Sequence, residues 1–281
     1  DVVLMNGFED DFVPKGATFT GKRKRARSTM LRVANCLLGE DLGDDTLIIG
    51  TSGRYEFKNK GIDVFLESLN RLNRDKDLKK KVLAFVNVPS WVGDPREDLQ
   101  KRLKSKDKFT EPLQCPFITH WLHNMTHDQV LDMLKYLGMG NRPEDKVKVI
   151  FVPCYLDGKD GILNKSYYDL ILGEDLSVYP SYYEPWGYTP LESVAFRVPT
   201  ITTDLAGFGL WVNSLKNQHG IEDGVEVLHR SDYNYSEVAD GIKDTIALFS
   251  TKTEAEIKEI RKRAGMVAEQ ALWKHFIQYY Y

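Results

Sequence analysis

The sequence has few cysteines. The 281-residue chain holds three, Cys36, Cys115 and Cys154, and no two of them form a CxxC motif. An odd number of widely spaced cysteines indicates neither a disulfide framework nor a cysteine-based zinc site. We therefore expect a cytoplasmic protein, kept in a reducing compartment.

Long apolar runs and an excess of one charge are also absent. No stretch of the sequence approaches the roughly 18 consecutive apolar residues of a membrane helix, and no basic-then-apolar signal region opens the chain. The formal net charge is −3, so the chain lacks the overall basic field of a dedicated nucleic-acid or membrane-surface binder. We expect neither a nucleic acid nor a membrane as a partner.

Short β-rich runs alternate with helical patterns along the chain. The apolar spacing predicts a helix over 23–38, and the opening run 2–7 resembles a strand that enters a turn at once, which suggests a fragment of a longer protein. Further strands are predicted at 46–52, 82–88, 147–153, 176–180, 199–203 and 224–228, with helices between them. This alternation predicts an α/β fold, a Rossmann-like parallel sheet of about six strands with helices on both faces.

One connection is longer than the others. The charged segment 94–118 exceeds the usual length of about 2–6 residues for a loop in an α/β unit. We predict that it is an insertion at an edge of the sheet.

Basic side chains follow the strand at 46–52. Arg54 and Lys60 lie in the loop 53–61, which enters a helix at Gly61. Ligands of parallel α/β sheets bind outside the carboxyl ends of the strands, and a guanidinium, an ammonium and a helix N-terminus together suit a diphosphate. A solvated basic loop is the alternative, and spacing alone does not decide between the two.

Two glutamates, Glu184 and Glu192, follow the strand at 176–180 and are separated by seven residues. If a helix begins at Thr189 or Pro190, these residues and Glu192 complete a capping box, which explains them by folding alone. Glu184 has no such explanation, because folding does not require a carboxylate among its aromatic neighbours. Glu184 is therefore a candidate catalytic group.

Three separated segments of this chain resemble the eukaryotic-type glycogen synthases, which are retaining glycosyltransferases of the GT-B fold. They are the loop 53–61, the string PSYYEPWGYTPLE at 180–192 and the string PTITTDLAGFG at 199–209, in the same order. The resemblance extends from Asn6 to near Trp273, and the segment 94–118 is least alike. It implies the C-terminal, donor-binding domain of a GT-B enzyme.

The resemblance implies a role for each motif residue in binding UDP-glucose. Glu184 would lie beside the transferred glucose and Glu192 would hold the ribose hydroxyls. Arg54 and Lys60 would neutralise the diphosphate. With Glu184 stabilising an oxocarbenium-like sugar, these two cations would stabilise the leaving UDP, and the family requires neither a metal nor another cofactor.

Further donor contacts are implied by position. Tyr167, seventeen residues before Glu184, would stack on uracil, although without the resemblance a helix-surface aromatic is the simpler interpretation. Gly187, Tyr188 and Thr189 would place backbone amides and a hydroxyl at phosphate oxygens, which favour helix N-termini.

The implied reaction is transfer of glucose from UDP-glucose to the non-reducing end of an α-1,4-glucan with retention. We divide the chain into an interdomain strand or linker with a helix (1–43), a Rossmann-like nucleotide-sugar domain (44–260) and a C-terminal helix (261–281) that would pack back toward the N-terminal domain. The acceptor-binding N-terminal domain would precede residue 1, so this chain alone should bind UDP and show little or no transfer of glucose. A homo-oligomer and the preference between UDP- and ADP-glucose stay open.

Two other functions remain open. A related retaining glycosyltransferase with another nucleotide sugar or acceptor would keep the same glutamates and cations. A non-catalytic glucan-binding relative would bind polysaccharide and ignore UDP, and the presence of Glu184, Arg54 and Lys60 argues against it.

Three histidines lie close together in the sequence. His120, His123 and His127 would share one face of a helix, which superficially resembles a metal site. No cysteine or carboxylate completes the set at a clear spacing. We therefore expect capping or surface roles for them, or positions along the donor cleft, and no metal.

Two basic runs have competing interpretations. The run 22–27 could bind a polyanion, but no aromatic residues interleave with it, and a solvated helix start is favoured. Near the C-terminus the resembled family carries a run of arginines that binds glucose 6-phosphate. Here only Arg261, Lys262 and Arg263 stand near that place, with Met266 where another arginine would fall, so control by glucose 6-phosphate is doubtful.

Overall fold

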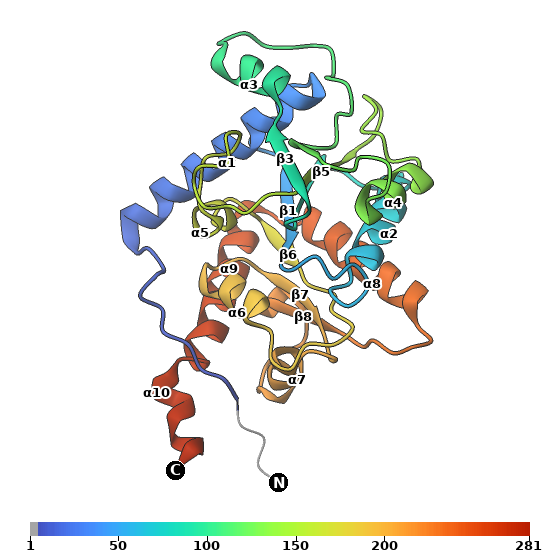
Figure 1. Ribbon diagram of the computed structural model, residues 1–281. Coiled ribbons are helices and arrows are strands. Elements are labelled where there is room, and N and C mark those ends of the chain that lie inside the picture. The colour runs from blue at the N-terminus through green and yellow to red at the C-terminus, as the bar shows by residue number, and fades with distance from the viewer. Residues whose placement is uncertain (1–4) are drawn as a thin grey trace.

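A single parallel sheet organises the chain. The computed structural model describes residues 5–281 (Figure 1). The strands are β1 (Leu47–Ser52), β2 (Val82–Asn87), β5 (Val147–Val152), β6 (Leu176–Val178), β7 (Thr200–Thr203) and β8 (Val225–Leu228). They lie in the order β5-β2-β1-β6-β7-β8, and every neighbouring pair is parallel. The prediction of one parallel sheet of six strands is confirmed.

Helices cover both faces of the sheet, as predicted. On one face, alternate residues of β1, β2 and β5 pack with the helices α2 (Ile62–Asn73), α4 (Gln129–Leu137) and α8 (Tyr235–Ser250). The intervening residues of the same strands pack with α1 (Gly16–Leu38) on the other face. All six residues of β2 and of β5 are buried, because a parallel sheet with helices on both faces leaves neither face in water.

A third apolar cluster lies beside β7 and β8. It joins α6 (Tyr188–Ala195), α7 (Gly207–Ser214), α9 (Glu254–Gln270) and α10 (Trp273–Phe276). Phe8 pairs with Leu272 in an isolated parallel bridge, so the two ends of the described chain run side by side (Figure 1). Of the opening strand predicted at 2–7, residues 2–4 lie outside the described part, and residues 5–7 form no strand.

The insertion at 94–118 lies at the edge strand β5, as predicted. Ile118 forms a parallel bridge with Phe151 of β5. The segment contains α3 (Glu97–Lys104), and the short strands β3 (Val92–Pro95) and β4 (His120–Leu122) flank it as an antiparallel pair. Arg96 is fully buried and donates to the carbonyl oxygens of Cys115 and Ile118, at 2.7 and 3.1 Å. The insertion is therefore an ordered element with its own polar anchor.

The basic run 22–27 is not wholly the solvated helix start that the sequence predicts. The helix α1 begins at Gly16, well before the run, and Arg23 and Arg27 both donate to the carboxylate of Asp175, at 2.7 and 2.8 Å. Their side chains are only 20% and 13% exposed. The prediction of a solvated helix start is wrong for these two residues, because they anchor α1 to the start of β6, and the same pairing removes them from a polyanion patch.

The strand order determines where a ligand can enter. The chain runs from β1 outward through β2 to β5, then returns to the opposite side of β1 and continues through β6, β7 and β8. The direction of winding therefore reverses between β1 and β6. Beyond the carboxyl ends of these two strands the connections diverge, which leaves the crevice where open α/β sheets bind ligands.

Candidate functional site

An ion pair lies at the crevice between β1 and β6. The ammonium of Lys60, in the loop after β1, donates to the carboxylate of Glu184, in the loop after β6. Their side chains are 15% and 20% exposed. The same two loops are joined by a hydrogen bond from the Tyr182 amide to the Asn59 carbonyl oxygen, 2.7 Å. The fold thus brings together two predicted site residues that are far apart in the sequence.

The backbone of Glu184 is held by the segment after β7. Its amide donates to the Leu205 carbonyl oxygen at 3.2 Å, and its own carbonyl oxygen accepts from the Gly207 amide at 3.1 Å. Glu184 also forms a parallel bridge with Ala206. All three segments that carry the resemblance, 53–61, 180–192 and 199–209, therefore meet around one carboxylate.

Arg54 stands apart from this pair. Its side chain is 78% exposed, and its guanidinium Nε lies 3.2 Å from the carboxylate of Glu56 in the same loop. An exposed pair of this kind contributes little to stability. Arg54 is therefore placed on the surface of the crevice loop, where it can move to a ligand at small cost.

The start of α6 differs from the predicted capping box. The helix begins at Tyr188, after Gly187 with φ 110° and ψ 76°, and no side chain caps it. Thr189 is therefore inside the first turn, and the carboxylate of Glu192 instead accepts from the Tyr168 hydroxyl at 2.9 Å. The capping-box interpretation is wrong, because a glycine in the left-handed region lets the chain enter the helix earlier.

This helix start leaves backbone donors available. The first amides of a helix have no intrahelical partner, and here they belong to Tyr188 and Thr189. Pro190, which has no amide hydrogen, occupies the third position, where such a hydrogen would also be unpaired. Together with the helix dipole, this end of α6 favours an anion.

Tyr167 begins α5 (Tyr167–Ile171), and its hydroxyl contacts two other hydroxyls near the carboxyl ends of β1 and β6. It is 2.7 Å from the Ser52 hydroxyl and 3.3 Å from the Tyr179 hydroxyl. Burial raises the pKa of Tyr167 well above its usual value, so the hydroxyl stays protonated. The interpretation of Tyr167 as a helix-surface aromatic is wrong. Sequence reasoning missed Ser52 and Tyr179, although their positions at the ends of β1 and β6 were a usable signal.

The ribose candidate Glu192 is oriented by the neighbouring tyrosine. Burial raises the pKa of Glu192, and the hydrogen bond from Tyr168 lowers it by a smaller amount. Burial likewise raises the pKa of Tyr168 to about 12. The tyrosine is thus a stable donor that holds the carboxylate near the first turns of α6 and α5.

The three histidines do not converge among the described residues. His120 lies in β4 and is buried, whereas His123 and His127 are exposed in the following turn. The His123 ring lies 4.9 Å from the ring of Trp91. The helix that would have aligned the three is not formed, because the segment pairs with β3. His120 instead meets Cys154 and Asp160, which sequence spacing did not reveal.

The C-terminal basic residues lie on α9. Arg261 is half-buried, and this burial together with the nearby charges of Arg23 and Arg27 lowers its pKa to about 9. The Arg263 guanidinium lies 3.5 Å from the carboxylate of Asp223. The expected lack of control by glucose 6-phosphate stays a prediction.

Among residues 5–281, no helix has the length and apolarity to cross a bilayer.

Comparisons with known proteins agree on one family. A family model described as glycogen synthase matches residues 37–95 and 92–281. A glycogen [starch] synthase of Neurospora crassa is 28% identical over 287 residues, which span 82% of this chain and 40% of that protein. Glycogen [starch] synthase isoform 2 of Saccharomyces cerevisiae is 29% identical over 291 residues, which span 82% of this chain and 41% of that protein. This chain thus spans about two fifths of the relatives it matches.

Solved structures share the fold at low identity. WaaG, a glycosyltransferase involved in lipopolysaccharide biosynthesis, superposes with a TM-score of 0.53 and 14% identity, over 99% of this chain and 54% of that chain. Anabaena Alr3699/HepE, in complex with UDP and glucose, superposes with a TM-score of 0.52 and 17% identity, over 99% of this chain and 54% of that chain. At these identities the likeness establishes the fold alone.

Proposed function

This chain belongs to the glycogen synthase family, and from that membership we propose that it supplies the donor-binding half of a retaining glucosyltransferase. Its α/β sheet is the Rossmann-like fold of GT-B glycosyltransferases. The complete enzyme would transfer glucose from UDP-glucose to the non-reducing end of an α-1,4-glucan. The observation that carries the proposal is the Lys60–Glu184 ion pair at the switch point of the sheet.

A nucleotide diphosphate fits the charges around this crevice. Lys60 and the free first amides of α6 are positive groups already held in place, and Arg54 is free to approach from the loop surface. Such preorganised donors stabilise the charge that develops on a leaving diphosphate. The solved HepE complex with UDP and glucose supports a nucleotide sugar as the ligand class.

The sugar and the nucleoside would lie on opposite sides of the diphosphate. Glu184 would stabilise the oxocarbenium-like glucose, with Lys60 shared between this carboxylate and the phosphate. Glu192, oriented by Tyr168, would accept from the ribose hydroxyls, and the Tyr167 ring would stack on uracil. Because the Tyr167 hydroxyl is fixed by Ser52, the ring has little freedom to lose on binding.

The domain division is part of the same proposal. The boundary we place at residue 260 falls inside α9, which runs continuously from Glu254 to Gln270. We assign the acceptor glucan to a cleft between this domain and a preceding one, so residues 1–281 should bind UDP without elongating glucan.

The cysteines at 36, 115 and 154 are all free thiols, which supports our assignment to the cytoplasm.

Isothermal titration calorimetry with UDP tests the site. Arg54→Ala removes a charge-assisted hydrogen bond worth about 1.5–3 kcal/mol, and Tyr167→Ala removes base stacking worth about 1–3 kcal/mol. Compared with the wild type, Arg54→Ala should therefore bind UDP about 10-fold or more weakly, and Tyr167→Ala about 5-fold or more weakly. Lys58→Ala, an exposed lysine of the same loop, is the matched control and should bind as the wild type does.

The outcome also separates the rival functions. Unchanged UDP affinity in both Arg54→Ala and Tyr167→Ala would reject the site assignment. Preference for another nucleotide diphosphate would identify a related transferase, and glucan binding without UDP binding would identify a non-catalytic relative. Robust glucan elongation by residues 1–281 would contradict the assignment of the acceptor site to another domain.

A further inference from the structure

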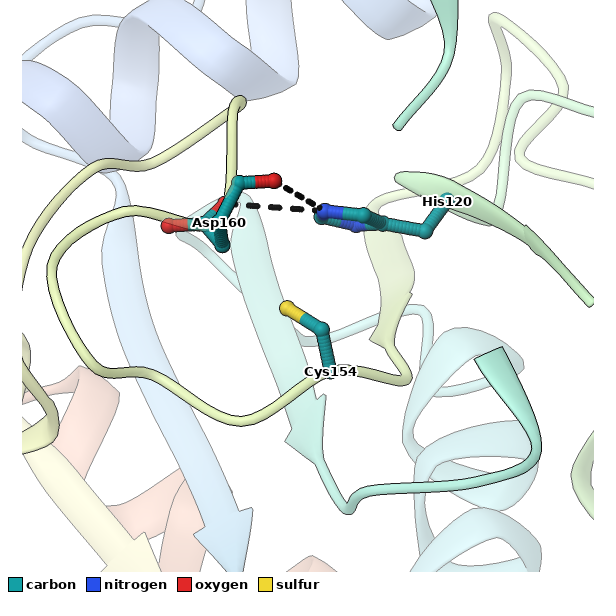
Figure 2. Close-up of side chains that lie close together, drawn as sticks. All are labelled: His120, Cys154 and Asp160. Atoms are coloured by element: carbon teal, nitrogen blue, oxygen red, sulfur yellow. Dashed lines mark hydrogen bonds and ion pairs between the residues drawn. The ribbon is translucent and has the colours of Figure 1, made fainter. Parts of the chain in front are cut away.

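A second group of chemically reactive side chains lies at the outer edge of the sheet. His120 of β4, Cys154 in the turn after β5 and Asp160 in the following loop face one another (Figure 2). One ligand atom from each lies within 4.8 Å of those of the other two. We propose that His120, Cys154 and Asp160 bind a zinc ion that fixes the loop 155–166 to β4.

The three side chains are shielded from solvent. The side chains of His120 and Asp160 are 2% and 0% exposed, and Cys154 is 7% exposed. The imidazole Nε2 lies 2.8 Å from the Asp160 carbonyl oxygen and 3.7 Å from its carboxylate Oδ2. The Cys154 sulfur points toward the same space (Figure 2). A modest inward movement would bring all three to the roughly 2.0–2.3 Å bonds of zinc.

The donor set selects the metal. One thiolate, one imidazole and one carboxylate are the ligand types of tetrahedral zinc sites, whereas magnesium and calcium prefer oxygen alone. The thiolate and the carboxylate together carry two negative charges, which balance a divalent cation without leaving a net buried charge. The carbonyl oxygen of Asp160 or a water molecule can occupy the fourth position.

Neighbouring groups already orient two of the ligands. In the structure His120 Nε2 donates to the Asp160 carbonyl oxygen, and Nδ1 lies 2.8 Å from the Thr119 hydroxyl. If the imidazole proton moves to Nδ1, the Thr119 hydroxyl can accept it in a hydrogen bond, which leaves the Nε2 lone pair for the metal. The carboxylate of Asp160 accepts from the amides of Ile162, Leu163 and Asn164, at 3.0, 2.9 and 2.7 Å. Metal ligands held in this way by outer partners are typical of protein zinc sites.

Metal binding is balanced by the release of one proton. In the metal-free protein burial raises the pKa of the Cys154 thiol to about 12 and lowers the pKa of His120. Zinc forms the Zn–S bond as the S–H bond breaks, and the thiol proton leaves to solvent. His120 stays neutral, with its single proton moved to Nδ1. The loop that becomes fixed ends at Ser166, which caps the helix α5.

Cobalt substitution tests this site. The metal-free protein, loaded with one equivalent of Co²⁺ and then dialysed, should retain one ion per chain and show a thiolate-to-cobalt charge-transfer band with tetrahedral ligand-field bands. Cys154→Ser should abolish the charge-transfer band, while the matched control Cys115→Ser keeps it. Thr119→Val should keep the band and weaken metal affinity by about 10–100-fold.

An independent measurement covers variants that fail to fold. X-ray absorption of the zinc-loaded wild type should show one sulfur ligand, with nitrogen and oxygen ligands completing four. Failure to retain the metal after dialysis would overturn the proposal, as would an absorption spectrum without sulfur or a charge-transfer band that persists in folded Cys154→Ser. Any of these results would leave the three residues as a buried structural cluster only.

Discussion

Lys60 and Glu184 neutralise each other in a setting that excludes most water. Both side chains are at least four-fifths buried, and Glu184 is fixed through its backbone by the segment after β7. Removing one partner leaves the other charge poorly solvated, which costs more than the pair itself contributes. In the free protein the pair therefore also holds the two loops together, in addition to any role in donor binding.

A double-mutant cycle of Lys60→Met and Glu184→Gln should measure this coupling. We expect an interaction energy of about 1–3 kcal/mol in urea unfolding, because the two side chains are in direct contact and largely shielded from water. The matched control is the exposed pair Arg54–Glu56 of the same loop, with Arg54→Met and Glu56→Gln, which should give less than about 1 kcal/mol. Equal coupling in the two cycles would contradict the assigned burial.

At the scale of elements, the crevice depends on how closely the loops after β1 and β6 approach. Gly61, at the start of α2, has φ 69°, and a Cβ atom added there would lie 2.0 Å from the Pro180 carbonyl oxygen. Gly138, at the end of α4, has the same backbone conformation, φ 68°, with no atom within 4 Å of such a Cβ. These two glycines separate backbone strain from contact between the loops.

Gly61→Ala should destabilise the protein more than Gly138→Ala does. Both variants incur about 1–2 kcal/mol for a side chain in the left-handed region, and Gly61→Ala adds about 1–3 kcal/mol for overpacking against Pro180. Urea unfolding measures the difference. UDP affinity should fall only for Gly61→Ala, because only that substitution displaces the proposed site, and equal losses of stability would indicate that the loops are not in close contact.

At the scale of the whole molecule, one buried carboxyl makes folding depend on pH. Glu174, just before β6, is 3% exposed and lies against the backbone of Gly50 in β1. Burial raises its pKa from 4.5 to about 8, opposed by a hydrogen bond from Ser177. Above pH 4.5 the unfolded chain loses this proton while the folded chain keeps it, so stability falls as pH rises toward 8.

Glu174→Gln should remove this pH dependence. The free energy of unfolding of the variant, relative to the wild type, should increase between pH 5 and pH 8, by up to about 1.4 kcal/mol per pH unit. Urea unfolding of both proteins across that range checks the sign. Parallel curves would mean that Glu174 ionises alike in the folded and unfolded chains, and a relative decrease would contradict the assigned direction.

Much of the fold could be predicted from local patterns. The strands β2 and β5 are apolar except for Asn87 and Lys148 because they are buried on both faces, and the alternation with helices was sufficient to predict a parallel sheet. The segments 53–61, 180–192 and 199–209 indicated the family, which the comparisons confirm. The roles assigned to Arg54, Tyr167 and Glu192 within the donor site stay predictions.

Other features depended on the tertiary structure. Arg23 and Arg27 appeared to begin a solvated helix, but their partner Asp175 lies about 150 residues further along the chain. The local pattern of Thr189, Pro190 and Glu192 fits a capping box, yet the left-handed backbone of Gly187 starts the helix earlier. In each case a contact or backbone conformation outside the local pattern changed the outcome.

The sequence by itself determined the elements, their parallel arrangement and the family, because periodicity and motifs are properties of neighbouring residues. Only the tertiary structure decided that Lys60 neutralises Glu184 and that His120 meets Cys154 and Asp160. These pairings require the strand order that reverses between β1 and β6 and the path of the insertion along β5. Side chains from distant segments meet only once the sheet has fixed where each loop ends.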